Sequence, residues 1–129
     1  SLDIKDFDIS FARGLSLEDG CATITNFTAY LIAKGIEHAN GNNSDPIKFL
    51  VCGGGRKNDY LINSIKSYLS HKQNISLNSI DDYSLNGDYI ESQAFGYLAI
   101  RSFLNLPISY PKTTGCVTPT VGGKLAQNI

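Results

Sequence analysis

Residues 49–58 read FLVCGGGRKN, and this stretch decides the fold class. Together with Ile47 and Lys48 before it, its first half forms a short, nearly continuous apolar run. Such a run is typical of a buried strand in a parallel or mixed sheet. The three glycines end the strand, and Asn58 can cap a helix that follows. The stretch therefore predicts a strand, a tight turn and a helix, the repeating step of an α/β fold.

The glycine turn has two interpretations. Gly53, Gly54 and Gly55 in succession weaken any regular element, so another factor must favour them. A nucleotide is one such factor, because N–H groups without a neighbouring Cβ can face phosphate at a helix N-terminus. A tight strand-to-helix turn that needs glycine is the other. The turn is neither a Walker A loop, since no Ser or Thr follows Lys57, nor a GxGxxG motif.

A helix is predicted on the N-terminal side of this strand. Ser16 can accept hydrogen bonds from the first backbone N–H groups, and Glu18 and Asp19 would lie in the first turn, where the helix dipole favours negative charge. Apolar residues then recur on two stripes, which predicts a largely buried helix. The pattern fades near Gly35 and ends before the loop signal of residues 40–43. The stripes are Ile24, Phe27, Thr28 and Leu31, and Ala29, Ile32 and Ile36.

Three more elements are predicted after Asn58. A helix with one clean apolar face is followed by a strand at Ile75 and Leu77. A polar loop over residues 81–88 leads to a helix over about 89–104, and the tail reads as loop or short extended pieces. The face of the first helix is Leu61, Ile62, Ile65, Tyr68 and Leu69, and the last helix is expected to point Ile90, Ala94, Phe95, Leu98 and Phe103 inward.

The predicted order is α-β-α-β-α within a single domain spanning residues 1–129. Strands separated by helices imply an α/β architecture with parallel pairing. Two strands make a thin sheet, and both apolar runs read as buried on both faces. We therefore expect an incomplete sheet. Strands from a missing N-terminal part would complete it, or a second copy in a homodimer would cover it.

Composition excludes several classes of protein. A net charge of -1 argues against nucleic-acid binding, which needs a clustered basic excess. No apolar run is long enough for a membrane span, and the polar start at residues 1–6 is unlike a signal peptide. Cys21, Cys52 and Cys116 form neither a CxxC pair nor a metal-ligand cluster. We expect them to be reduced, buried thiols in a cytoplasmic protein.

Asp88 and Glu91 are the second chemical signal. They are three residues apart at a predicted helix start, so both carboxylates would share roughly one face. An N-cap with first-turn carboxylates explains both residues. Alternatively, a carboxylate there accepts hydrogen bonds from a sugar hydroxyl. No partner for a glycosidase acid/base pair is identifiable. His38 and His71 are interpreted as cations near helix C-termini.

Four segments in this order resemble the C-terminal part of the anhydro-N-acetylmuramic acid kinases. They are the segment ATITNFTA at 22–29, which is similar to the family's ATLTxxTA, then LVCGGG at 50–55 with Asn58 and Leu61, then Gly87-Asp88 with Glu91 and Ala94-Phe95, and finally Thr114-Gly115-Cys116 with Gly122. The resemblance spans roughly residues 16–122. Each motif is weak alone, and the four together are fairly specific.

The resemblance implies an actin-like (ribonuclease H-like) ATPase fold of two α/β domains around a cleft that holds ATP and Mg²⁺. Such kinases add water across the anhydro bond of 1,6-anhydro-N-acetylmuramic acid and phosphorylate the freed 6-hydroxyl, in cell-wall recycling. By similarity, Gly53, Gly54, Gly55 and Asn58 would bind the nucleotide. Glu91 would lie near the sugar, with Asp88 supporting it.

The sequence departs from the family where the catalytic base belongs. The N-terminal phosphate-binding segment and the DTGPGN-type segment, whose aspartate the family uses as general base, have no match in this sequence. No catalytic residue and no metal ligand is therefore assigned, and this chain alone is expected to show no kinase turnover. Two alternatives are a non-catalytic remnant or interaction domain of the same fold, and another actin-like ATPase module.

Overall fold

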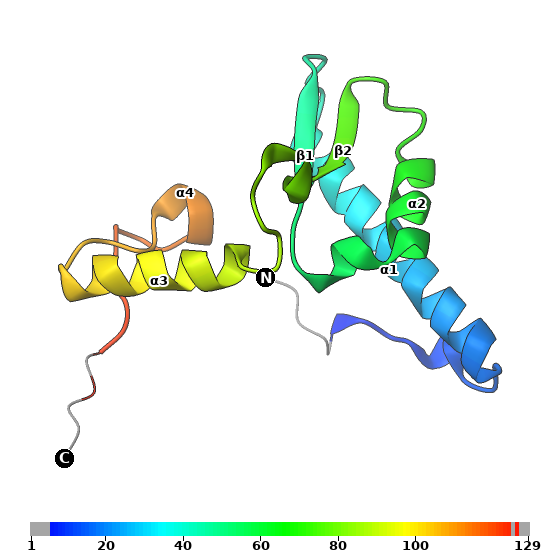
Figure 1. Cartoon of the computed structure of the whole chain (residues 1–129), viewed down its shortest axis with the longest axis horizontal. Coiled ribbons are helices and arrows are strands. Elements are labelled where there is room, and N and C mark those ends of the chain that lie inside the picture. Colours follow the sequence, from blue (N-terminus) through cyan, green and yellow to red (C-terminus); the bar gives the residue numbers. More distant parts are fainter. Residues whose placement is uncertain (1–5, 125, 127–129) are drawn as a thin grey trace.

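The computed structural model describes residues 6–124 and residue 126. The element order is the predicted α-β-α-β-α, followed by one short extra helix, and Figure 1 shows it. The helices are α1 (Leu17–Asn40), α2 (Asp59–Tyr68), α3 (Ile90–Phe103) and α4 (Pro111–Thr114), the strands are β1 (Ile47–Val51) and β2 (Ile75–Ser79), and the 3-10 turns are η2 (Ser10–Ala12), η3 (Gly54–Lys57) and η4 (Ile80–Tyr83).

Helix α1 begins where its sequence predicts. The Ser16 side chain accepts from the Asp19 N–H at 3.0 Å, which confirms the cap. The predicted weakening at Gly35 is wrong, because α1 continues to Asn40 and ends at Gly41 with φ 56°. One helical glycine costs only about 1 kcal/mol relative to alanine. Burial of Ala33 and Ile36 on either side of Gly35 offsets this cost.

The two strands pair in parallel, as predicted, in the register Ile47↔Ile75 to Val51↔Ser79. They form a two-stranded sheet in the described part of the chain, which agrees with the expectation of an incomplete sheet. One face of this sheet packs against α1 and α2, with Phe49 contacting the core cluster between those helices. That cluster consists of Ala29, Ala33, Ile36, Ile65 and Leu69.

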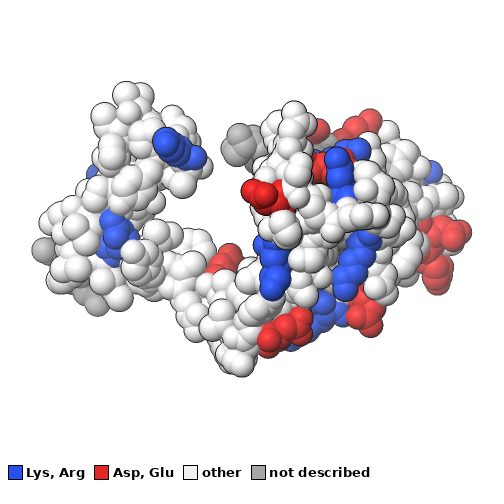
Figure 2. Space-filling view, turned by 90° about the horizontal axis from the view of Figure 1, so that it is seen from above, with Lys and Arg blue, Asp and Glu red and all other residues white. Residues whose placement is uncertain are grey.

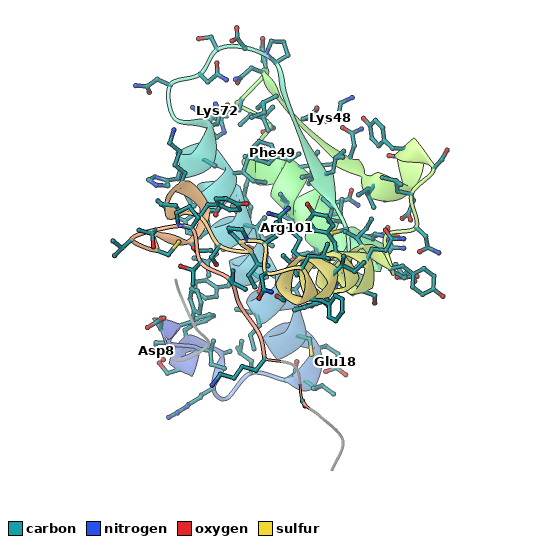
Figure 3. The ribbon with its side chains drawn as sticks, turned by 90° about the vertical axis from the view of Figure 1, so that its left-hand side faces the viewer. Asp8, Glu18, Lys48, Phe49, Lys72 and Arg101 are labelled. Atoms are coloured by element: carbon teal, nitrogen blue, oxygen red, sulfur yellow. The ribbon has the colours of Figure 1, made fainter. Side chains whose placement is uncertain are left out.

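The opposite face of the sheet lies open, so the prediction of strands buried on both faces is wrong for the described residues. Figure 3 shows Lys48 and Phe49 on opposite sides of β1. Lys48 is exposed and lies 4.9 Å from the centre of the Tyr83 ring, and Leu50 on the same face is 45% exposed. The prediction of a largely buried α1 holds only in part. Ala29 and Ile36 of the second stripe are buried, but Ile32 on that stripe is 40% exposed and Ile24 on the first stripe is 37% exposed.

Helix α3 lies in an arm, residues 90–124, beside the body of the molecule, residues 17–79, which holds α1, α2 and the sheet (Figure 1). The prediction that its apolar residues point inward is wrong, because none of its described residues is buried and Phe103 is 73% exposed. Within the arm, Arg101 donates to the carbonyl of Pro107 at 2.7 Å and to the Tyr110 hydroxyl at 2.8 Å. The tail contributes α4 and an antiparallel bridge between Ser109 and Thr120.

The cysteines are free thiols within the described residues, as expected, but they are not buried. Cys21 and Cys52 are exposed and Cys116 is half-buried, because the elements that carry them lack a covering layer. Every helix in the described part of the chain is too short or too polar to cross a membrane.

Candidate functional site

The site lies where the two parallel strands end. The turn η3 follows β1, and η4 follows β2. Because the strands are parallel, both turns leave the sheet at the same edge. Ligands of open α/β sheets bind outside the carboxyl ends of the strands. The predicted nucleotide residues and the predicted sugar residues both lie in the segments that follow this edge.

Gly53 has a structural explanation. Its backbone conformation, φ 78° and ψ 177°, belongs to a region that glycine adopts almost exclusively. Its N–H donates to the carbonyl of Gly87 at 2.9 Å. The strand-end turn is therefore joined to the segment that leads into α3. The Gly53 N–H is already used in this bond and is not free to donate to a ligand.

Gly54 and Gly55 lack such an explanation. Neither has a left-handed φ, and a Cβ at Gly54 would meet no atom of the described residues within 4 Å. A Cβ at Gly55 would lie 3.6 Å from the Leu61 side chain, an ordinary contact. Their N–H groups begin the η3 turn, where backbone donors have no acceptor within the turn. The described residues therefore give no reason for glycine at these two positions. Close approach of a ligand would be one.

Asn58 caps α2, as predicted. Its Oδ1 accepts from the Leu61 N–H at 3.0 Å. The side-chain Nδ2 makes no hydrogen bond with the described residues and remains a donor for a ligand. The nucleotide role of Asn58 stays a prediction.

Asp88 is occupied by cations. Its carboxylate accepts from Arg56 Nη1 at 2.6 Å and from Lys57 Nζ at 2.7 Å. These bonds lower the pKa of Asp88 from 3.8 to about 2, with Arg56 as the larger cause. The N-cap interpretation of Asp88 is wrong, because Tyr89 holds that position and no side chain caps the described α3.

Glu91 differs from Asp88. It lies in the first turn of α3, as predicted, and its side chain is exposed without a hydrogen-bond partner among the described residues. Of the two predicted sugar-side carboxylates, Glu91 is therefore the one with open acceptor oxygens. The substrate roles of both residues stay predictions.

Sequence reasoning missed Arg56 and Asp81. Arg56 donates to Asp81 through Nε at 2.5 Å and Nη2 at 3.3 Å, and its side chain is only 7% exposed. Asp81 also accepts from the Gly87 N–H and the Ser79 hydroxyl, both at 2.9 Å. Hydrogen bonds with Asp88 and Asp81 raise the pKa of Arg56, and the bond from Arg56 lowers the pKa of Asp81.

A sequence signal for this pair existed. Arg56 follows the first predicted strand, and Asp81 follows the second. Parallel pairing brings residues after neighbouring strands to one edge of the sheet. Opposite charges in those two positions therefore predict an ion pair.

These features define a class of protein. The chain is an α/β unit whose strand-end loops form a candidate ligand site, and whose second sheet face and apolar arm are left exposed by the described residues. The chain belongs to the anhydro-N-acetylmuramic acid kinase family, whose sequence profile matches residues 5–128.

Individual relatives agree with this assignment. The chain is 50% identical over 129 residues to the anhydro-N-acetylmuramic acid kinase of Pelagibacter ubique, covering 99% of this chain and 34% of the relative. It is 41% identical to that of Zymomonas mobilis, covering 97% of this chain and 32% of the relative. The kinase of Caulobacter vibrioides is 38% identical, with 100% of this chain and 33% of the relative covered. The chain thus spans about a third of the length of these relatives.

Proposed function

We propose that the chain is the C-terminal part of an ATP-dependent kinase that acts on 1,6-anhydro-N-acetylmuramic acid. Water adds across the anhydro bond, and the γ-phosphoryl group of ATP passes to the freed 6-hydroxyl, giving N-acetylmuramic acid 6-phosphate. Membership of the family supports the substrate. An actin-like arrangement of two domains around a cleft, with the rest of the protein as the second wall, belongs to this proposal.

One observation carries the proposal. The Gly53 N–H donates to Gly87 O at 2.9 Å, so the glycine turn and the segment before Glu91 are neighbours at the strand ends. The turn is the candidate nucleotide side, and Glu91 is the candidate sugar side. Phosphoryl transfer depends mostly on positioning the two substrates and on neutralising charge, and this juxtaposition serves the first need.

The residues of the turn fit a nucleotide. The open space over Gly54 and the N–H groups of Gly54 and Gly55 would admit a phosphate, with Asn58 Nδ2 as a further donor. Mg²⁺ neutralises phosphate charge in such reactions. The described residues contain no cluster of three metal-ligating side chains. Mg²⁺ would therefore be held by the phosphates and by residues in the rest of the protein.

The sugar side rests on Glu91. Its exposed carboxylate would accept a hydrogen bond from a sugar hydroxyl and orient the ring toward the phosphate. Asp88 would support it by fixing the start of α3 through its ion pairs with Arg56 and Lys57.

The whole protein that contains this chain tests the function. We expect it to release ADP from ATP and Mg²⁺ when 1,6-anhydro-N-acetylmuramic acid is added, and not with N-acetylglucosamine. The isolated 129-residue chain should show no turnover, because it supplies one wall of a site that must close around the substrate. Absence of turnover from the whole protein would instead favour a non-catalytic remnant of the fold. A homodimer and a cytoplasmic location stay predictions.

A further inference from the structure

One cation connects the loops at the strand ends. We call the five residues Gly53, Arg56, Asp81, Gly87 and Asp88 the joint. The Arg56 guanidinium donates to Gly53 O at 2.9 Å, to Asp88 at 2.6 Å and to both oxygens of Asp81. These acceptors belong to the turn after β1, the turn after β2 and the segment before α3. A planar guanidinium with five fixed donors can hold three segments in this way, and a lysine ammonium cannot hold the same geometry.

The joint also explains Gly87. This residue is buried, and its φ is not in the left-handed region. A Cβ built on Gly87 would lie 2.7 Å from Arg56 Cζ and 2.9 Å from Arg56 Cδ. Such distances are shorter than real Cβ contacts, so a side chain at position 87 would have to push the Arg56 side chain out of its present place. The two residues therefore fit together as a pair.

The charges of the joint are balanced once the neighbouring Lys57 is included. Arg56 and Lys57 carry two positive charges, and Asp81 and Asp88 carry two negative charges, all linked by ion pairs. Arg56 is 7% exposed, whereas Lys57 is 62% exposed. The Arg56 guanidinium is therefore committed to the protein, and a phosphate could reach it only by displacing carboxylates. Its place in the structure favours a positioning role over contact with a substrate.

We propose that Arg56 is a positioning residue that locks the nucleotide-side glycine turn to the sugar-side start of α3. This inference rests on the proposed kinase function. Each side still contacts its own substrate when the lock is lost, but the distance between the two reacting groups is no longer fixed. Misplacement of reacting groups by about 1 Å can lower a rate about 100-fold. Loss of Arg56 therefore lowers kcat and leaves both KM values nearly unchanged.

Steady-state kinetics of the whole protein test this role. Arg56→Ala and Arg56→Lys are expected to lower kcat about 10- to 100-fold, with KM for ATP and for the sugar changing less than about 3-fold. Arg56→Lys keeps the charge and serves if the alanine variant fails to fold. Lys34→Met is the matched control, because it removes an exposed ion pair with Glu37 on α1, and it should keep the wild-type kcat. A rise in KM for ATP alone would overturn the proposal in favour of direct nucleotide contact.

A double-mutant cycle separates the joint from general loss of stability. Gly87→Ala should lower kcat by pushing the guanidinium away. In the Arg56→Ala background the same change meets no obstacle, so the double variant should be no slower than Arg56→Ala alone. Effects that multiply would overturn the pairing of the two residues.

Amide hydrogen exchange tests the lock without using activity. The Gly53 N–H is bonded to Gly87 O, so it should exchange faster in Arg56→Lys than in the wild-type 129-residue chain, while the Ile65 amide in the core stays protected. Unchanged exchange at Gly53 would overturn the proposal even if the kinase activity is real. Faster exchange in a protein without turnover would uphold the lock and overturn only the proposed reaction.

Discussion

The body and the arm of this molecule have similar apolar sequence patterns but different surroundings. The body, residues 17–79, buries Ile65 to 2% exposure between α1, α2 and the sheet. The arm, residues 90–124, leaves Phe95 63% exposed and Phe103 73% exposed. Hydrophobic periodicity marks a face that needs burial, and a core forms only where another element meets that face.

Charge follows the same division. Among the charged residues, only Glu91, Arg101, Lys112 and Lys124 fall between residues 90 and 124. In the view of Figure 2, most acidic and basic side chains lie on the body, and the arm is mostly uncharged. An apolar, weakly charged surface of this kind is typical of an interface. Since the relatives are about three times longer, we expect the rest of the protein to cover the arm.

The largest loss of stability is expected for a substitution in the core of the body. Ile65→Ala removes buried methyl groups at the contact of α1 and α2, so it should lower the free energy of unfolding of this chain by about 2–5 kcal/mol. Urea denaturation followed by circular dichroism measures the change. A loss below about 1 kcal/mol would mean that the body is not the stable part of the molecule.

The next largest loss of stability is expected for a substitution in the glycine turn. Gly53→Ala forces alanine into a region reserved for glycine and should lower the free energy of unfolding by about 1–3 kcal/mol. Gly54→Ala is the matched control, because its Cβ enters open space and its φ is ordinary. Equal losses in the two variants, measured by the same denaturation, would contradict the structural explanation of Gly53.

The stability that the joint contributes should depend on pH. The pKa of Asp88 is lowered to about 2 when folded, so its ion pairs stabilise the fold above the unfolded pKa of 3.8. This contribution is lost as the pH falls from about 4 towards 2. Asp88→Asn should therefore be less stable than wild type at pH 7, and the difference should shrink through that window. A difference that stays constant from pH 7 to pH 2 would exclude Asp88 as its source.

The smallest change in the stability of this chain is expected for a substitution in the arm. Phe103→Ala is expected to change the free energy of unfolding of the 129-residue chain by no more than about 0.5 kcal/mol, since the ring contacts little. In the whole protein the same substitution should destabilise far more, provided that the arm is covered there. Equal effects in both proteins would refute our inference that the rest of the polypeptide packs on α3.

Local sequence patterns predicted the elements well. The Ser16 and Asn58 caps, the two strands and the helix order were confirmed, because capping and periodicity act over a few neighbouring residues. Burial was predicted poorly for α3, the strands and the cysteines. A pattern can show that a face is apolar, but it does not show whether the same chain supplies the partner for that face.

The candidate site divides in the same way. The sequence by itself determined the glycine turn, the first-turn place of Glu91 and the family to which the chain belongs. Only the tertiary structure decided that Asp88 pairs with Arg56, that Gly53 is joined to Gly87, and that Arg56 also pairs with Asp81. The physical reason is that these contacts join residues 25 to 34 positions apart, which meet only when β1 and β2 pair in parallel register.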